Sequence, residues 1–242
     1  MARDTETSVQ IGTTPAPEQL VIKVTADGPY QVKGAPPIYQ ATIEINEKGT
    51  SVGYLKGQEF PSKATVFLCR CGRSKNAPFC DGSHKTAGVD LTETASFEPL
   101  LAGSTEVDGP VIALTDNEKY CAFARFCDQG LRIWNEVQRP GASHQAMATK
   151  EAHQCPSGRL LVWDKQSQQP IEQAETPSIG LIEDPAQECS GPLMVRGGIR
   201  VESASGRSYE VRNRQTLCRC GESSNKPFCD GTHASIKYRD GI

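Results

Sequence analysis

One stretch of the chain gathers three cysteines and a histidine within sixteen residues. It reads CRCGRSKNAPFCDGSH and runs from Cys69 to His84. Cysteine thiolate and histidine imidazole are the side chains that most readily bind zinc and iron in proteins. Four such donors at this spacing therefore predict a metal site, with the ligands Cys69, Cys71, Cys80 and His84.

The same arrangement of donors occurs a second time, in residues 218–233. This stretch reads CRCGESSNKPFCDGTH and differs from the first at four of its sixteen positions. Both copies keep the pattern C-x-C-x8-C-x3-H, and the repeat extends upstream to GPYQVKG at 28–34 and GPLMVRG at 191–197. The repeat predicts a second metal site of the same kind, with the ligands Cys218, Cys220, Cys229 and His233.

Spacing alone leaves two kinds of metal centre open. Three Cys and one His form a good structural zinc set, because Zn²⁺ accepts four tetrahedral sulfur and nitrogen donors. The same set suits a [2Fe–2S] cluster, in which each iron takes two protein donors. Zinc sites more often use C-x2-C than C-x-C, and two separated donor pairs suit two irons at least as well as one zinc. The spacing favours the cluster and does not exclude zinc.

Both stretches resemble the CDGSH iron–sulfur domain family, the mitoNEET-like group. The signature of that family is C-x-C, then Ser or Thr, then Pro-x-Cys-Asp-Gly, a small residue and His. Beyond the eight donors, the matching residues are Ser74, Pro78, Asp81, Gly82 and Ser83 in the first copy, and Ser223, Pro227, Asp230, Gly231 and Thr232 in the second. The resemblance implies one [2Fe–2S] cluster per motif, held by the eight donors named above, and so two clusters as cofactors.

The resemblance also carries an expectation about assembly. Family members with one motif dimerise and place two clusters side by side across a twofold axis. This chain contains two motifs, so we expect a monomer that forms the equivalent pseudo-dimer within one polypeptide. The insert between the motifs departs from the family pattern. It must connect the two copies without blocking the contact between them.

A histidine ligand changes what such a cluster can do. Replacing a thiolate by neutral imidazole removes about one negative charge, so the potential rises above that of plant-type ferredoxins, as in Rieske centres. Imidazole also titrates near neutral pH and can leave the metal when protonated. We therefore expect one-electron transfer and/or cluster transfer, with an unidentified redox partner or cluster acceptor protein. The alternative is a structural zinc protein whose insert binds a partner.

Strand patterns precede both donor stretches. Residues 20–26 and 40–46 alternate apolar and polar side chains, and residues 198–213 predict two short strands joined by a turn at Ser205-Gly206. A short helix is expected after each donor stretch, with Asp81 and Asp230 as its N-cap residues.

Between the copies the pattern becomes partly helical. Residues 115–138 predict a helix that starts with a capping box and is broken, if anywhere, near 128–130. Residues 143–155 predict a second helix, 158–165 a strand and 166–178 a surface loop. The expected fold class is α+β, with two small β-rich iron–sulfur units in a pseudo-twofold arrangement and a helical insert. The predicted divisions are a flexible tail at 1–19, the first unit at 20–95, the insert at 96–188 and the second unit at 189–242.

Four cysteines lie outside the motifs, namely Cys121, Cys127, Cys155 and Cys189. Proline follows Cys155, as it follows the last ligand of ferredoxin-like loops, so a third cluster is conceivable. Cys121 and Cys127, however, would lie about 240° apart around the predicted helix and would converge only if that helix breaks. We therefore expect buried thiols here rather than a third metal site.

Composition and missing motifs narrow the remaining function classes. A net charge of -3 over 242 residues gives no global attraction to nucleic acid. No run approaches the roughly 18 apolar residues of a membrane span, and residues 1–20 resemble neither a secretory signal nor a transit peptide. The ten cysteines therefore indicate a soluble protein of the reducing cytoplasm. No Walker loop, nucleophile elbow or dinucleotide fingerprint occurs, so we expect no catalytic residues and no enzyme.

Overall fold

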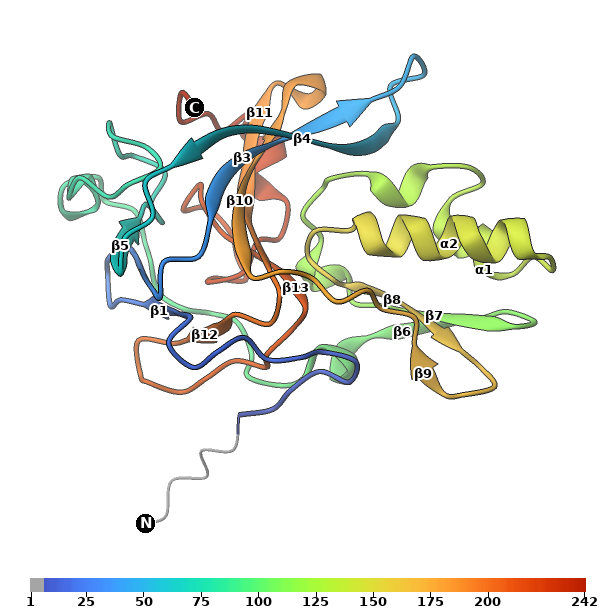
Figure 1. The fold of residues 1–242 in the computed structure, drawn as a ribbon. Helices are drawn as coiled ribbons and strands as arrows, with labels where there is room; N and C mark the ends of the chain where they lie inside the picture. Colours follow the sequence, from blue (N-terminus) through green and yellow to red (C-terminus); the bar gives the residue numbers. More distant parts are fainter. Residues whose placement is uncertain (1–6) are drawn as a thin grey trace, which may run out of the picture.

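The computed structural model of the chain describes residues 7–242, and within this range the protein is mostly β-structure (Figure 1). Three α-helices occur there: α1 (Ile133–Val137), α2 (Ala142–Gln154) and α3 (Thr232–Ser235). The strands are β1 (Val21–Val24), β2 (Tyr30–Lys33), β3 (Ile38–Ile45), β4 (Ser51–Phe60), β5 (Thr65–Leu68), β6 (Thr105–Asp108), β7 (Ile112–Asp116), β8 (Leu160–Asp164), β9 (Gln169–Pro170), β10 (Ser178–Asp184), β11 (Cys189–Arg196), β12 (Arg200–Glu202) and β13 (Arg214–Leu217).

Two of the three sheets are built jointly by the two copies. Their strand orders are β12-β1-β2-β5 and β13-β11-β10-β3-β4. By position around the repeated motifs, β1, β2, β3 and β5 of the first copy correspond to β10, β11, β12 and β13 of the second. The third strand of each copy pairs in parallel with the first strand of the other, β12 with β1 and β3 with β10. Each sheet therefore contains a strand from the other copy.

The first copy is the longer of the two because it carries β4. This strand pairs with β3 as an antiparallel hairpin at the edge of its sheet. In the second copy the chain turns instead at Gly206, whose φ is 84°. The strands predicted at 20–26 and 40–46 are confirmed as β1 and β3, and β12 confirms the first of the two predicted at 198–213. The second is reduced to an isolated bridge between Glu202 and Ser208.

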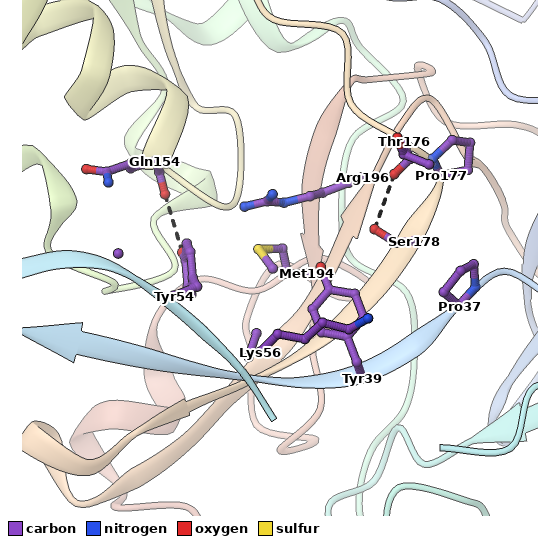
Figure 2. Close-up of a pocket in the computed structure, with 12 residues that line it drawn as sticks. Pro37, Tyr39, Tyr54, Lys56, Gln154, Thr176, Pro177, Ser178, Met194 and Arg196 are labelled. Atoms are coloured by element: carbon purple, nitrogen blue, oxygen red, sulfur yellow. Dashed lines mark hydrogen bonds between the residues drawn. The ribbon is translucent and has the colours of Figure 1, made fainter. Parts of the chain in front are cut away.

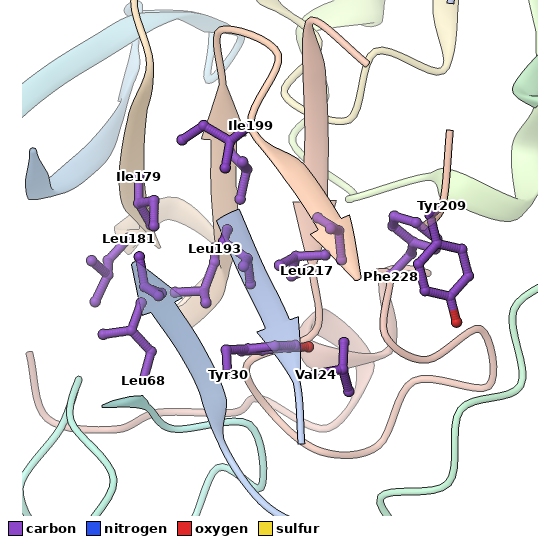
Figure 3. Packing of buried hydrophobic residues seen from close by; sticks show 14 of the residues in the cluster. Val24, Tyr30, Leu68, Ile179, Leu181, Leu193, Ile199, Tyr209, Leu217 and Phe228 are labelled. Atoms are coloured by element: carbon purple, nitrogen blue, oxygen red, sulfur yellow. The ribbon is translucent and has the colours of Figure 1, made fainter. Parts of the chain in front are cut away.

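The main hydrophobic core joins both shared sheets, so the two copies fold around one apolar interior. Figure 3 shows side chains from the two copies packed together, among them Val24, Tyr30, Leu68, Ile179, Leu181, Leu193 and Leu217. The Tyr30 ring is fully buried, and its hydroxyl donates to the carbonyls of Cys218 at 2.8 Å and Pro227 at 3.0 Å. A residue of the first copy thus supports the backbone of the second metal-binding loop.

The insert has a sheet and a core of its own. Its strand order is β6-β7-β8-β9, with antiparallel pairs throughout. Apolar residues of β7 and β8 pack with those of α1 and α2, including Leu114, Ile133, Ala148 and Val162. The helix predicted at 143–155 and the strand predicted at 158–165 are confirmed as α2 and β8. The segment 166–178 is mainly a loop, apart from the two residues of β9 and Ser178, with which β10 begins.

The helix predicted over residues 115–138 is wrong. This stretch contains the end of β7, the 3₁₀ turns Glu118–Tyr120 and Phe126–Asp128, and only the five residues of α1 as α-helix. Phe123 and Arg125 have φ values of 52° and 62°, in the left-handed region that a right-handed helix excludes.

The buried apolar residues of that stretch pack in three different places. Tyr120 packs in the main core, Phe126 packs against β3 and β10, and Ile133 packs in the core of the insert. Each residue is apolar because its own partner is apolar. These residues are therefore buried at three sites and do not form one helix face.

The N-terminal tail expected at 1–19 is described only from residue 7 onward, and residues 1–6 lie outside the described residues. Val9 forms a bridge with Val211, and the amide of Ala16 donates to the carbonyl of Gly198 at 2.9 Å. This part of the tail therefore runs beside the second copy. Within residues 7–242 no helix has the length and apolar character needed to cross a membrane.

Candidate metal centres

Each predicted ligand set lies on one loop that follows a strand. The first donor loop, residues 69–84, follows β5, and the second donor loop, residues 218–233, follows β13. The amide of Cys69 donates to the carbonyl of Pro78 at 2.8 Å, and the amide of Cys80 donates to a carbonyl of β5 at 2.9 Å. The second donor loop repeats both bonds at 2.8 and 2.9 Å. These bonds bring the two ends of the donor pattern side by side.

Two polar side chains of the motif hold the first donor loop in shape. The Ser74 hydroxyl donates to the carbonyl of Phe79 at 2.6 Å. The Asp81 carboxylate accepts from the amides of Lys75 at 2.8 Å and Ser83 at 2.9 Å, and these bonds hold the pKa of Asp81 well below its usual range. The equivalent serine and aspartate of the second donor loop make the same bonds. Both residues therefore act on the loop rather than on a metal.

The short helix expected after each donor loop is present, but its N-cap is not the aspartate. The helices are a 3₁₀ turn at Ser83–Lys85 and α3, and they are preceded by Gly82 and Gly231 with φ values of 89° and 90°. Glycine suits this left-handed position because it has no Cβ. The aspartate lies one residue earlier and accepts a hydrogen bond from the first helical amide.

The four donors of each loop form two pairs. The Sγ atoms of Cys69 and Cys71 lie 3.7 Å apart, and the Sγ of Cys80 lies 3.4 Å from Nδ1 of His84. The second donor loop has the same separations, 3.7 and 3.4 Å. Over residues 7–242, no three His, Cys, Asp or Glu side chains are placed to hold one metal ion. The chemistry of the donor set fits a group with two metal atoms, and the eight ligands stay a prediction.

A hydrogen bond within each Cys-x-Cys pair makes one thiolate easy to form. The bond from Cys71, helped by backbone amides, lowers the pKa of Cys69 to about 6, and the same arrangement lowers the pKa of Cys218 to about 7. The pKa values of the partners Cys71 and Cys220 are raised, because each keeps the shared proton. The thiolate is the form of cysteine that binds metal. Each loop thus offers one such ligand near neutral pH.

The two donor loops differ in their exposure to solvent. All four donors of the second donor loop are buried, and His233 is only 4% exposed. In the first donor loop, Cys80 and His84 are half-buried. Burial also lowers the pKa of His233 to about 4, which keeps the imidazole in the neutral form that binds metal. The sequences of the loops are nearly identical, so the difference arises from what surrounds them.

The insert is what covers the second donor loop. The Phe228 ring packs edge-on against Tyr120 with 5.2 Å between centroids, and the guanidinium of the buried Arg212 lies 4.4 Å from each of these rings. A Cβ atom at Gly231 would lie 3.1 Å from the carbonyl oxygen of Cys121. The insert therefore packs against the second donor loop and shields this loop from solvent.

The two donor loops also lie against each other. Arg73 pairs with Glu222 across the contact at 2.8 Å. Arg73 and Glu222 occupy the same position in the two copies, and this is one of the four positions at which the copies differ. A Cβ atom at Gly221 would lie 2.7 Å from the carbonyl oxygen of Cys71, so the two backbones touch at this point.

A buried arginine follows the first cysteine of each loop. Arg70 is 1% exposed, and its guanidinium donates to three backbone carbonyls at 2.6 to 2.9 Å. Arg219 is equally buried but pairs with the carboxylates of Asp240 and Glu183. Among the residues described, Arg70 has no carboxylate partner. The positive charge beside the first donor loop is therefore less compensated than that beside the second.

The remaining cysteines do not lie as expected. Because the predicted helix is absent, Cys121, Cys127 and Cys155 meet around a small cavity in the insert. Cys189 lies apart from them in β11. The one sequence signal for this convergence was the proline that follows Cys155. All ten cysteines are free thiols in the structure.

The pocket in Figure 2 lies away from both donor loops, between β3, β4, β10 and the end of α2. Tyr39, Tyr54, Lys56 and Arg196 contribute to its wall, and the Tyr54 hydroxyl donates to the carbonyl of Gln154 at 3.3 Å. Its lining contains no Cys, His, Asp or Glu side chain. This pocket therefore offers no side-chain ligand of the usual metal-binding types.

Comparison with known families finds matches to two of them along the chain. Residues 27–85 and 190–234 both match the family described as iron-binding zinc finger, CDGSH type. Residues 107–165 match the family described as divergent 4Fe-4S mono-cluster. No curated protein and no solved structure matches the chain. The two matches to the first family contain both donor loops, and the match to the second contains the three cysteines of the insert. The chain is therefore a tandem member of the CDGSH iron-binding family, with a divergent iron–sulfur domain inserted between its two copies.

Proposed function

We propose that this protein is a one-electron carrier in which each donor loop holds a [2Fe–2S] cluster through three cysteines and one histidine. The observation that carries this proposal is the arrangement of donors in twos, with Sγ–Sγ pairs at 3.7 Å and Sγ–Nδ1 pairs at 3.4 Å. A two-iron cluster needs two ligands on each iron, whereas zinc needs four ligands around one point.

When bound, each cluster would accept and release one electron at a potential above that of a four-cysteine site, because imidazole carries no negative charge. The residues around the sites would tune this potential. Buried cations favour the reduced and more negative state, and the buried residues Arg70 and Arg219 follow the first cysteine of each pair in the sequence. The carboxylates that neutralise Arg219 reduce this effect at the second site.

The two copies would be related by a pseudo-twofold axis. Support comes from the reciprocal strand exchange, in which β12 joins β1 and β3 joins β10. It also comes from the reciprocal contact of Gly72 with Cys220 and of Gly221 with Cys71. One polypeptide would thus bring two clusters together and act as a monomer. The half-buried Cys80 and His84 make the first site the place where an electron partner has access.

Cluster donation to an acceptor protein is a close variant of this function. The observation that favours it is the exposure of the first site, since a cluster that leaves the protein must do so through its accessible ligands. We propose a carrier rather than an enzyme, acting in the reducing cytoplasm, because the sequence contains no Walker loop, nucleophile elbow or dinucleotide fingerprint.

Anaerobically purified protein provides the first test. We expect an iron–sulfur absorption spectrum that bleaches on reduction, returns on oxidation, and persists at a constant iron content over repeated cycles. A colourless protein that contains about one zinc per donor loop would contradict the proposal and support the structural zinc alternative, in which the insert serves to bind a partner.

Electron and cluster transfer are separated by adding an apo-ferredoxin as acceptor. Electron transfer leaves the iron on this protein, whereas cluster donation moves iron and sulfide to the acceptor, which is measured after separating the two proteins. Substitution His84→Cys is the matched variant, because a thiolate dissociates less readily than imidazole. It should slow cluster donation and lower the potential of one cluster.

A further inference from the structure

The loop from Cys121 to Cys127 curves around a small cavity in the insert. It leaves the 3₁₀ turn Glu118–Tyr120 and enters the turn Phe126–Asp128. Phe123 and Arg125 both adopt left-handed φ values, which residues with side chains rarely adopt. Two such residues within three positions bend the backbone, so Cys121 and Cys127 face the same space although six positions separate them.

Cys155 completes the lining from the other side. It ends α2, where the chain turns to extended geometry before Pro156. Its carbonyl accepts a hydrogen bond at 2.7 Å from the buried Arg214 of β13, which anchors the cysteine to the second copy. A cysteine followed by proline at the end of a helix supplies a ligand in ferredoxin loops.

The rest of the cavity lining is apolar or positively charged. It includes Phe126, Leu160 and the guanidinium of Arg159, which is 6% exposed and has Asp116 as its one carboxylate partner among the described residues, at 3.4 Å. A cation beside three thiols suits a bound group of negative charge. Apart from the three cysteines, the lining contains no His, Asp, Glu or Cys side chain.

We propose that Cys121, Cys127 and Cys155 bind a third cluster of the three-iron [3Fe–4S] type, with one thiolate on each iron. In clusters of the cubane type each iron takes one protein ligand, so three thiolates complete three irons. A fourth iron would find no side-chain ligand in this lining, and Cys189 lies elsewhere in β11. Binding displaces one proton from each thiol. The assignment thus differs from the four-iron cluster named for the matched family.

The third site lies against the second donor loop. The carbonyl oxygen of Cys121 is 3.1 Å from where a Cβ of Gly231 would lie. The ring of Tyr120, next to Cys121, packs edge-on against the ring of Phe228, next to Cys229, and the Arg212 guanidinium lies 4.4 Å from both ring centroids. An electron could therefore pass between the second donor loop and the insert, a role that rests on the proposed carrier function. The binding site itself does not depend on that role.

Iron and sulfide analysis together with electron paramagnetic resonance tests this site. We expect about seven irons and about eight sulfides per chain, against about four of each for the two motifs alone. An oxidised [2Fe–2S] cluster is silent because its two ferric spins cancel, but three ferric ions have half-integer total spin. The oxidised, anaerobically prepared protein should therefore show a paramagnetic signal. About four irons and no signal in the oxidised protein overturn the third site and leave the carrier function standing, whereas about eight irons overturn the three-iron assignment.

Single substitutions locate the ligands. Cys121→Ser, Cys127→Ser and Cys155→Ser should each abolish the oxidised signal and lower the iron content by about three, while the reduced signals of the motif clusters persist and report that the protein is folded. Cys189→Ser is the matched control and should keep the signal. A signal that survives in the three ligand variants, or that is lost in the control alone, overturns the assignment.

Discussion

The backbone of Gly72 in the first donor loop touches the carbonyl of Cys220 in the second. A Cβ atom at Gly72 would lie 2.5 Å from that carbonyl oxygen, well inside any tolerated contact, and the residue has φ of 68°. Two separate requirements, a left-handed backbone and a close approach, therefore meet at this one position. The contact joins the metal-binding loops directly and does not pass through the core.

Gly72→Ala should destabilise the contact between the two donor loops. We expect a loss of about 3 kcal/mol in the free energy of unfolding, because the added methyl group meets a backbone carbonyl that cannot move without moving the loop. Urea unfolding of the iron-loaded protein measures it. Gly88→Ala is the matched control, because Gly88 has a similar φ of 64° but open space around it. Its cost should be about 1 kcal/mol. Equal losses in the two variants would contradict the contact.

The donor loops could be predicted from the sequence because their structure is local. The eight donors, the serine and aspartate that hold each loop, and the glycine before each short helix all act within sixteen residues. Strands β1 and β3 could also be predicted from the sequence, because the alternation of apolar and polar side chains is a local pattern. The aspartate was misplaced by one residue as a cap, because it bonds the first helical amide from outside the helix.

The rest of the architecture depends on contacts between distant segments. The pairing of β12 with β1 and of β3 with β10 could not be predicted from the sequences of these strands, because the paired strands lie more than a hundred residues apart in the chain. The helix wrongly predicted at 115–138 failed for the same reason. The apolar residues of this stretch pack in three different hydrophobic clusters. The sequence alone does not distinguish that arrangement from one continuous helix face. The burial of the second donor loop likewise follows from the docked insert.

The first site should lose its metal before the second. Cys80 and His84 are half-buried, whereas the donors of the second donor loop are covered by the insert. Treatment of the oxidised Cys121→Ser variant, which keeps only the two motif clusters, with an iron chelator should give two phases of bleaching that differ by about tenfold in rate, since the buried site must open first. The measurement is visible absorption against time at neutral pH.

Two variants assign these phases. His84→Cys should change the spectrum and rate of the fast phase alone, and His233→Cys those of the slow phase alone. Each should lower the potential of its own cluster, because the added thiolate brings negative charge. A single phase, or a fast phase that responds to His233→Cys, would contradict the difference in access.

Removing the carboxylate of Asp240 should raise the potential of the second cluster. Asp240 pairs with Arg219 at 2.5 Å, and the positive charge of this guanidinium acts on the ligand His233 of the second donor loop. Asp240→Asn leaves more uncompensated positive charge there, which favours the reduced cluster by an amount on the order of tens of millivolts. Redox titration followed by the paramagnetic signals of the reduced protein measures the shift.

The same substitution should also cost stability, by about 2 kcal/mol, because it weakens a buried ion pair. Asp108→Asn is the control, since Asp108 is exposed and pairs with Lys165 on the surface at 2.6 Å. It should change neither quantity measurably. A potential that falls in Asp240→Asn, or stays constant while stability drops, would show that Arg219 acts only in folding.

Glu151 makes the stability of the protein fall as pH rises. The side chain is fully buried in α2, and neither of its carboxylate oxygens has a hydrogen-bond partner within residues 7–242. Burial, with the charges of Glu136 and Asp128, raises the pKa of Glu151 to about 9. Between the ordinary carboxyl range near pH 4.5 and pH 9 the unfolded chain is ionised while the folded chain keeps the proton. The folded state therefore binds one more proton in this window, and its stability decreases by about 1.4 kcal/mol per pH unit.

Glu151→Gln should remove this slope, because the amide keeps the shape of the protonated acid and does not titrate. Denaturant unfolding at several pH values between 6.5 and 8.5 measures this slope. Glu47→Gln, at an exposed residue, should leave the slope unchanged. If Glu151→Gln and the wild type lose stability in parallel over this range, the carboxyl is ionised inside the fold and must gain a cation or water partner there.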